Sequence, residues 1–268
     1  TANADAGSIS ILKNATITGF AETIEIGTLG NPHGVAIADF DDDGKRDVAV
    51  ASFATNSIEI FRNLGKGNLA PVAKFAVGGS PWPISIADFD SDGRPELAVA
   101  NYTSGNISVL RNTGTLTFAT SVQYTVGSGP RALCSFDFNG DSSPDLAVAN
   151  YQSYDVFILR NKGYGTFVIS ENISIADGPS GVIPADLNGD GFLDLAVSRE
   201  RSDSVSILIS YRQGSFLPAV DYKAGASPCS VVAADFDGDG HADIAVANRK
   251  SNNISLFLGN GDGTLGTP

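Results

Sequence analysis

A repeat of 49 residues constrains this chain more than any other feature of its sequence. Five acidic segments begin at Asp39, Asp88, Asp137, Asp186 and Asp235, each 49 residues after the previous one. Two other series keep the same register, namely the prolines Pro32, Pro81, Pro130, Pro179 and Pro228 and the β-branched residues Ile9, Ile58, Ile107, Val156, Val205 and Ile254. Equal steps without slippage indicate a chain built from structural repeats.

Each repeat is expected to contain four short strands. In the first full repeat, residues 35–38 precede the acidic segment, residues 47–51 follow it, and residues 57–61 and 71–77 complete the unit. Glycine, asparagine and proline mark every junction, and no segment has a helical period. Alanine and valine on both faces of the first two strands favour sheets packed between neighbours. The sequence therefore predicts an all-β chain, a β-propeller with four-stranded blades.

The chain ends leave the closure of the ring open. We expect one domain, 1–268, with partial repeats at its two ends, 1–31 and 228–268. Four full repeats lie between them, at 32–80, 81–129, 130–178 and 179–227. A five-bladed ring, which we favour, forms if the strand at 20–26 completes the last sheet and the strand at 8–13 is surplus. Alternatively, the ring has six or seven blades with a part elsewhere, or the terminal strands pair with a neighbouring molecule.

The net charge of −13, from 30 acidic and 17 basic residues, argues against nucleic acid and anionic membrane surfaces as partners. No apolar run approaches the roughly 20 residues that cross a bilayer, so membrane insertion is not expected. The first residues lack a secretory signal pattern and the sequence has no methionine, so we expect a processed or excised piece. The excess acid indicates either an acidic surface or a set of cation sites.

The acidic segments have the pattern of a calcium loop. Positions 1, 3, 5, 7 and 9 of loop 1 (39–47) are Asp39, Asp41, Asp43, Lys45 and Asp47. The aspartates offer carboxylates, position 7 offers its backbone carbonyl, and Gly44 permits a positive φ at position 6. Hard oxygen ligands in a flexible loop suit Ca²⁺. An EF-hand is excluded, because position 12 lacks glutamate and no helices flank the loop.

The other four loops repeat this arrangement, which predicts about five calcium ions. Their positions are Asp88, Asp90, Asp92, Arg94 and Glu96 in loop 2 (88–96); Asp137, Asn139, Asp141, Ser143 and Asp145 in loop 3 (137–145); Asp186, Asn188, Asp190, Phe192 and Asp194 in loop 4 (186–194); and Asp235, Asp237, Asp239, His241 and Asp243 in loop 5 (235–243). Four acids in loops 1, 2 and 5 and three in loops 3 and 4 account for 18 of the 30. In loop 3, Ser142 replaces the glycine, so strain or weaker binding is expected there.

The pattern D-F-D-G-D-G-x-x-D-[LIV]-A-V-A, followed by N-x-[IV]-S-[IV]-L, resembles the FG-GAP/VCBS repeats of integrin-α-like propellers over essentially the whole chain. The resemblance implies a stabilising calcium ion at each hairpin loop and an extracellular or cell-surface location. The surplus first strand and the incomplete last sheet favour a structural or adhesive module for protein–protein assembly, including self-association or filaments through exchanged terminal strands. Fungal propeller lectins are similar too, which makes carbohydrate binding the alternative function.

Recognition is expected at the loops opposite the calcium end. The residue after each recurring proline varies (His33, Trp82, Arg131, Ser180, Cys229), as does a residue after the second strand (Phe53, Tyr102, Tyr151, Glu200, Arg249). From these we predict Trp82 as the best contact residue, with His33, Arg131, Tyr102 and Tyr151 as further ligand contacts. The alternative is that the aromatic side chains only pack between loops.

Catalysis is not expected, and a polysaccharide-active enzyme is the weakest alternative. The sequence has two histidines, of which His241 lies in a calcium loop and His33 has no recognisable nucleophile motif. We therefore assign no catalytic residues.

Two other residue types bear on an extracellular location. Asparagines in N-x-S/T sequons are glycan sites in a eukaryotic secreted protein, and they are Asn14, Asn101, Asn106, Asn172 and Asn253. We expect Cys134 and Cys229 to be buried free thiols, because they occupy different positions of the repeat.

Overall fold

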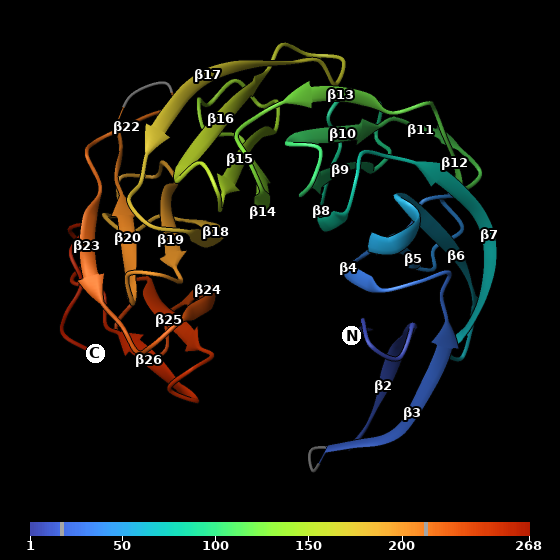
Figure 1. Cartoon of the computed structure of the whole chain (residues 1–268), viewed down its shortest axis with the longest axis horizontal. Helices are drawn as coiled ribbons and strands as arrows, with labels where there is room; N and C mark the ends of the chain where they lie inside the picture. Colours follow the sequence, from blue (N-terminus) through green and yellow to red (C-terminus); the bar gives the residue numbers. More distant parts are fainter. Residues whose placement is uncertain (17–18, 212–213) are drawn as a thin grey trace. The chain divides into compact units, whose positions relative to one another are not determined.

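The chain is all-β apart from one short 3₁₀ turn, η1 (Phe53–Thr55) (Figure 1). The computed structural model describes residues 1–16, 19–211 and 214–268, with the backbone only for 14–16 and 20–22. The chain divides into two compact units, Thr1–Thr125 (unit 1) and Val126–Pro268 (unit 2). Each unit is built from antiparallel sheets that follow one another along the sequence.

Unit 1 contains three sheets and one small hairpin. The first sheet has the order β1 (Ala2–Asn3), β2 (Ser8–Thr16) and β3 (Gly19–Gly27). The second has β4 (Pro32–Ala38), β5 (Asp47–Ser52), β6 (Ser57–Gly65) and β7 (Asn68–Ala76). The third has β8 (Pro81–Ala87), β9 (Glu96–Asn101), β10 (Asn106–Leu110) and β13 (Val122–Thr125), and the hairpin is β11 (Asn112–Gly114) with β12 (Thr117–Phe118).

Unit 2 repeats this plan. Its first sheet has the order β14 (Pro130–Phe136), β15 (Asp145–Asn150), β16 (Asp155–Asn161) and β17 (Phe167–Ser174). Its second has β18 (Pro179–Ala185), β19 (Asp194–Arg199), β20 (Ser204–Leu208) and β23 (Val220–Lys223), with the hairpin β21 (Ser210–Tyr211) and β22 (Ser215–Phe216). Its third has β24 (Pro228–Ala234), β25 (Asp243–Asn248) and β26 (Asn253–Phe257). The four strands predicted for each full repeat are therefore confirmed.

One pairing of the terminal strands is defined within unit 1. β3 forms its antiparallel ladder with β2, from Ser8 opposite Gly27 to Thr16 opposite Gly19, and the sheet that ends in β26 has three strands. This ladder occupies one edge of β3, so the five-bladed closure, in which β3 completes the last sheet, stays a prediction. The number of blades and any strand exchange between copies stay predictions.

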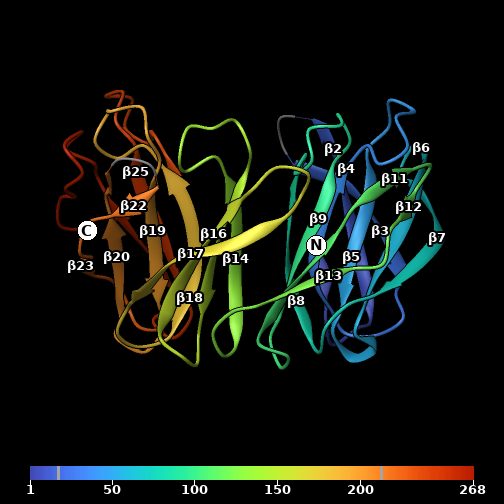
Figure 2. The same ribbon diagram turned by 90° about the horizontal axis from the view of Figure 1, so that it is seen from above.

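Strand order fixes which loops share an end of each sheet. In a four-stranded antiparallel meander, the loop between the first and second strands and the turn between the third and fourth lie at one end. The loop between the second and third strands lies at the opposite end, together with the connection to the next sheet (Figure 2). The acidic loops thus share the first end with the turns that follow β6, β10, β16 and β20.

Within each unit, neighbouring sheets are packed through their buried central strands, and the residue at position 2 of loops 1 to 4 is also buried. All six residues of β5, β9, β15 and β19 are buried. At position 2, Phe138 is 1% exposed and joins a core cluster with Leu195, Leu208 and Phe216 of the following sheet. Its ring centroid lies 5.9 Å from that of Phe216 in an edge-to-face arrangement. Loop 5 is the exception, because Phe236 at the same position is 49% exposed.

Among the described residues, no helix has the length and apolar character that a membrane-spanning segment needs.

Position 2 allows a direct test of how much the sheets depend on the loops. We expect Phe138→Ala to lower the free energy of unfolding by about 3–5 kcal/mol, because it leaves a cavity between two sheets. Phe236→Ala is the matched control in the same unit, and its half-exposed ring predicts a loss of no more than roughly 1 kcal/mol. Urea denaturation followed by circular dichroism measures both. Equal losses in the two variants would contradict this packing role.

Candidate functional site

The five acidic loops fold alike because their first and fifth side chains hold the loop backbone. The carboxylate of Asp39 accepts the N–H of Gly44 at 2.8 Å, and that of Asp43 accepts the N–H of Lys45 at 2.9 Å. The same two contacts recur in every loop, in loop 5 as Gly240 to Asp235 at 3.0 Å and His241 to Asp239 at 2.8 Å. These bonds keep the side chains of positions 1 and 5 at the loop.

Two residues in each loop have left-handed backbone geometry. Position 6 was predicted to need a positive φ, and Gly44 has a φ of 81°. Ser142 takes a φ of 68° at that position, so the strain expected in loop 3 is present, since residues with a Cβ adopt this region at a cost. Position 4 also has a positive φ, with 60° for both Asp42 and Ser91. The sequence analysis did not foresee this second left-handed position.

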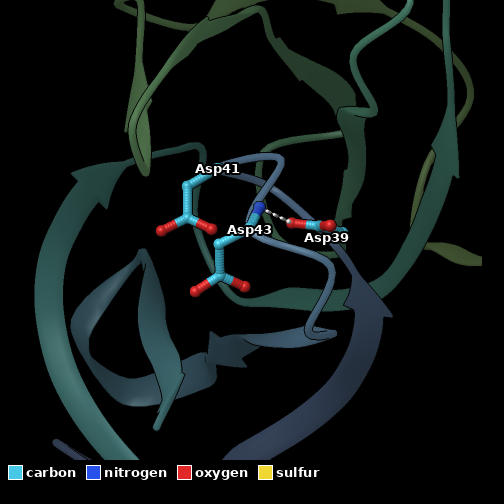
Figure 3. A group of neighbouring side chains, drawn as sticks. All are labelled: Asp39, Asp41 and Asp43. Carbon is cyan, nitrogen blue, oxygen red and sulfur yellow. Dashed lines mark hydrogen bonds between the residues drawn. The ribbon is translucent and has the colours of Figure 1, made fainter.

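Loop 1 gathers three carboxylates at the position predicted for a metal ion. One oxygen each from Asp39, Asp41 and Asp43 lies within 4.8 Å of the others. Figure 3 shows these side chains, with the bond from the Asp43 backbone to Asp39 dashed. The Asp41 side chain is 7% exposed, and its Oδ1 atom is buried without a hydrogen-bond partner. Burying a carboxylate oxygen without a donor is costly, so this oxygen fits a bound cation.

The predicted ligands come together to different degrees in the other loops. Loop 2 gathers Asp88, Asp90 and Glu96, and loop 5 gathers Asp235, Asp237 and Asp239. In loops 3 and 4 the third position is Asn139 or Asn188, and within the described chain no group of three acids forms there. Loops 1, 2 and 5 therefore fit a divalent cation held by their carboxylates. The predicted count of five ions is not tested.

The acid at position 9 has a structural role that the sequence analysis missed. Asp47 is fully buried, and its carboxylate accepts the N–H of Phe40 at 3.2 Å and that of Asn63 at 2.8 Å. Phe40 lies in the acidic loop and Asn63 lies near the end of the third strand, β6, so one carboxylate joins the loop to that strand. Glu96, Asp145, Asp194 and Asp243 make the same pair of bonds in their repeats.

Burial makes the carboxylates of Glu96, Asp145 and Asp194 harder to ionise, because it raises their pKa values. It raises the pKa of Glu96 to about 7 and the pKa values of Asp145 and Asp194 to about 6, and the neighbouring acids of each loop act in the same direction. The hydrogen bonds from the backbone oppose this rise but do not cancel it. A bound divalent cation would favour the ionised carboxylates.

Basic side chains neutralise part of the charge in loops 1 and 2. The Lys45 ammonium lies 2.9 Å from Asp43, and the Arg62 guanidinium lies 2.9 Å from Asp41. In loop 2, Arg94 lies 3.1 Å from Asp92, and Arg111 pairs with Asp90. The sequence analysis assigned no role to Arg62, which lies in β6, or to Arg111, which directly follows β10. Their signal was the repeat itself, because Arg62 and Arg111 are 49 residues apart.

Loops 1 and 2 also border a common cavity of about 310 Å³, with Asp41, Asp42 and Arg94 among its lining residues. A second cavity, of about 470 Å³, lies at loop 3 and is lined by Asp141, Arg160 and Lys162 among others. Both cavities lie at the end of the sheets that carries the acidic loops.

The predicted rim residues of unit 1 lie together in an aromatic cluster. The ring centroid of His33 lies 4.8 Å from that of Phe53 and 4.5 Å from that of Trp82, which in turn lies 5.8 Å from Tyr102. All four side chains are half-buried. Burial also lowers the pKa of His33, against the opposing charge of Asp5. The rings therefore pack on one another and also keep some exposed surface.

The rim residues of unit 2 form a charged cluster instead. Glu200 pairs with both Arg131 and Arg249, and the Arg131 guanidinium lies 4.5 Å from the ring centroid of Tyr151. The guanidinium carbon of Arg201, a residue that the sequence analysis did not single out, lies 4.9 Å from the centroid of the same ring. Ser180 and Cys229 are not part of this contact set. Rim residues thus lie close together within each unit, and their role as ligand contacts stays a prediction.

The sequons and cysteines need two corrections. Asn101 is fully buried, and its amide nitrogen donates to Asn106 and Ser108, so it cannot carry a glycan in the folded chain. Asn172 and Asn253 are exposed and Asn106 is half-buried, whereas the side chain of Asn14 lies outside the described residues. Cys134 and Cys229 are free thiols as predicted, but they are half-buried rather than fully buried.

Repeated four-stranded sheets with acidic hairpin loops place this chain among the β-propellers. It belongs to the family of FG-GAP-like repeat proteins, whose model matches residues 39–99, 88–148, 137–197, 197–246 and 235–268. Among curated proteins, none matches the sequence. The family assignment confirms the resemblance drawn from the loop pattern.

Three solved structures illustrate the fold. An Agrocybe aegerita lectin that recognises non-reducing terminal N-acetylglucosamine is 23% identical, with a TM-score of 0.61 over 90% of this chain and 66% of the lectin. BBS1N in complex with ARL6DN is 18% identical, with a TM-score of 0.68 over 99% of this chain and 75% of the BBS1N chain. Virginiamycin B lyase from Staphylococcus aureus is 15% identical, with a TM-score of 0.64 over 99% and 78%. At these identities the similarity extends to the fold alone.

The two hydrogen bonds that the position-9 acid accepts give a prediction that does not depend on a bound cation. With a chelator present, we expect Asp194→Asn to lower the free energy of unfolding by about 1–3 kcal/mol, because an amide has one acceptor oxygen for two buried N–H donors. Asp177→Asn is the control, since Asp177 is exposed and its φ of 58° is one that asparagine adopts readily. Urea denaturation measures the difference. A loss no larger than that of the control would refute the structural role.

Proposed function

We propose that this chain is a calcium-stabilised interaction module that works outside the cell and binds a protein partner through its rim. The rim is defined as the aromatic cluster of unit 1 and the charged cluster of unit 2. The acidic loops, at the opposite end of the sheets, stabilise the scaffold and do not contact the partner. We assign no catalytic step to the chain.

The observation that carries this proposal is the composition of the rim. Tryptophan, tyrosine, phenylalanine and arginine side chains gather there, and these types are enriched at protein interfaces and among the residues that dominate binding energy. The backbone holds them in place, since Phe53 donates its N–H to Asn31 at 3.0 Å and Tyr102 donates to Ser80 at 3.0 Å. The same backbone hydrogen bond recurs from repeat to repeat, while the side chain that it positions differs. This combination suits recognition by variable residues on a rigid scaffold.

The aromatic cluster keeps carbohydrate binding as the second candidate. Half-exposed Trp82 and Tyr102 rings can stack on a sugar, and a structurally similar protein is a lectin that recognises terminal N-acetylglucosamine. Another similar structure, BBS1N, is in complex with ARL6DN, which supports a protein partner for a scaffold of this type. The arginines of the charged cluster favour the protein partner, because arginine is enriched at protein interfaces and among the residues that dominate their binding energy.

Calcium and an extracellular location support each other in this proposal. Loops 1, 2 and 5 gather carboxylates, and Asp41 keeps a buried oxygen without a donor. Loops with such oxygen ligands in extracellular modules bind calcium at the high concentrations found outside cells. A cation that binds the folded state alone stabilises it by mass action.

Calcium removal is therefore expected to destabilise the chain. Because binding at about 100 times the dissociation constant adds about 2.7 kcal/mol per site, a chelator should lower the melting temperature by many degrees. Differential scanning calorimetry with and without chelator measures the shift, and magnesium in place of calcium is the control for ionic strength. An unchanged melting temperature would rule out the calcium part of the proposal.

The rim is tested by comparing two aromatic substitutions. Trp82→Ala is expected to abolish capture of a cell-surface or matrix protein from the source organism, because it removes the centre of the aromatic cluster. Tyr164→Ala is the matched control, since Tyr164 is 86% exposed and lies outside the rim. Pull-down with the immobilised chain measures capture, and melting curves confirm that both variants are folded.

The same pair of variants separates the two candidates. If a glycan array binds the wild-type chain and Trp82→Ala removes that binding, the carbohydrate function replaces the protein function. If wild type and both variants capture the same proteins, the rim is not the binding surface.

A further inference from the structure

We propose that Arg62 and Arg111 are built-in counter-ions that make loops 1 and 2 weaker calcium sites than loop 5. This inference rests on the proposed calcium binding and adds an order of affinity among the loops. It assigns a role in setting cation affinity to Arg62 of β6 and to Arg111, which directly follows β10, although neither residue lies in an acidic loop.

Loop 1 shows how the counter-ion is placed. The Arg62 guanidinium lies 2.9 Å from Oδ2 of Asp41 and 3.2 Å from Oδ2 of Asp43. Asp41 and Asp43 belong to the three carboxylates that gather in this loop. A positive charge at these oxygens opposes a divalent cation electrostatically and competes for the same carboxylates. The Arg62 side chain is 44% exposed, so water also screens part of this effect.

Loop 2 repeats the arrangement one repeat later. Arg111 pairs with Asp90, and its guanidinium lies 3.9 Å from Asp92. The Asp90 side chain is 2% exposed, so burial leaves its charge dependent on this partner or on a bound cation. Two loops with the same arginine contact make a chance surface pairing a poor explanation.

Loop 5 provides the natural comparison, because it carries aspartate at positions 1, 3, 5 and 9 like loop 1. The residue in register with Arg62 is Leu258, and the residue in register with Lys45 is His241. Within the described part of the chain, no lysine or arginine forms an ion pair with the acids of loop 5. The two loops thus present the same four carboxylates with and without internal counter-ions.

A loop with an internal counter-ion should bind calcium more weakly and should also depend less on calcium for its stability. In loop 5, whose gathered carboxylates are exposed, water and salt screen part of the repulsion, and no basic side chain among the described residues contributes to relieving it. In loop 1, Arg62 relieves part of it without calcium. Loop 1 should therefore lose less stability when calcium is removed, and it should need more calcium to fill.

The affinity of each loop can be read separately from its position-6 glycine. The N–H groups of Gly44 and Gly240 donate to the first aspartates of loops 1 and 5, so their amide resonances report on their own loops. The experiment is a calcium titration of the full chain by ¹H–¹⁵N NMR at about pH 8, where an ordinary imidazole is neutral. For wild type, we expect the Gly240 resonance to reach its midpoint at about tenfold lower calcium than that of Gly44.

Two opposite substitutions test the cause. Arg62→Gln should lower the Gly44 midpoint by about tenfold and leave the Gly240 midpoint unchanged. Leu258→Arg should raise the Gly240 midpoint, and it tests the same idea independently if Arg62→Gln folds poorly. Arg46→Gln is the charge control, because Arg46 is exposed in loop 1 and has no ion pair among the described residues. It should move the Gly44 midpoint much less than Arg62→Gln.

The outcomes separate this inference from the calcium proposal. If calcium shifts both glycine resonances but Arg62→Gln leaves or raises the Gly44 midpoint, the arginine orders the carboxylates for the ion and the counter-ion role is wrong. If neither resonance responds at millimolar calcium, the calcium proposal and this inference both fail. A lower melting temperature of Arg62→Gln in chelator, restored by calcium, would support the counter-ion role further.

Discussion

The repeat depends on one buried carboxylate in each unit of 49 residues. In the first full repeat, Asp47 accepts the backbone N–H of Phe40 from the acidic loop and that of Asn63 near the end of β6. Ionised groups are costly to bury, and the raised pKa values of Glu96, Asp145 and Asp194 show that the hydrogen bonds offset this cost only in part. The carboxylate thereby joins the acidic loop to the end of the third strand.

This bond links the acidic loops to the packing of the sheets. The residue whose N–H binds the buried carboxylate is the same one whose side chain enters the core, as Phe138 does above Asp145. Positions 1, 3 and 5 on either side of it carry the oxygens that gather in loops 1, 2 and 5. A short stretch of chain therefore places a core residue and potential metal ligands alternately. An interaction that orders the oxygens at positions 1, 3 and 5 therefore also orders the core residue at position 2.

The sequence predicted the strands and loop positions well because both follow the repeat register. It predicted less where contacts join residues from different parts of a unit. The contact of Asp47 with Asn63 near the end of β6, the contact of Arg62 with Asp41 and the burial of Asn101 all depend on the ends of the strands meeting in space. Counting strands shows which sheets are incomplete, but not which neighbour a terminal strand will choose.

Loops with the same motif need not be the same site. Loops 1 and 5 have identical acids at positions 1, 3, 5 and 9, yet the first has basic partners and the second has Leu258 and His241 in register with them. The difference arises from the end of the third strand, outside the motif that identifies the loop. Substitution there leaves the hairpin backbone unchanged, because its hydrogen bonds involve the loop's own aspartates. A repeat scaffold can therefore change the electrostatics of one loop while keeping its fold, and motif counts alone cannot give the number of equivalent cation sites.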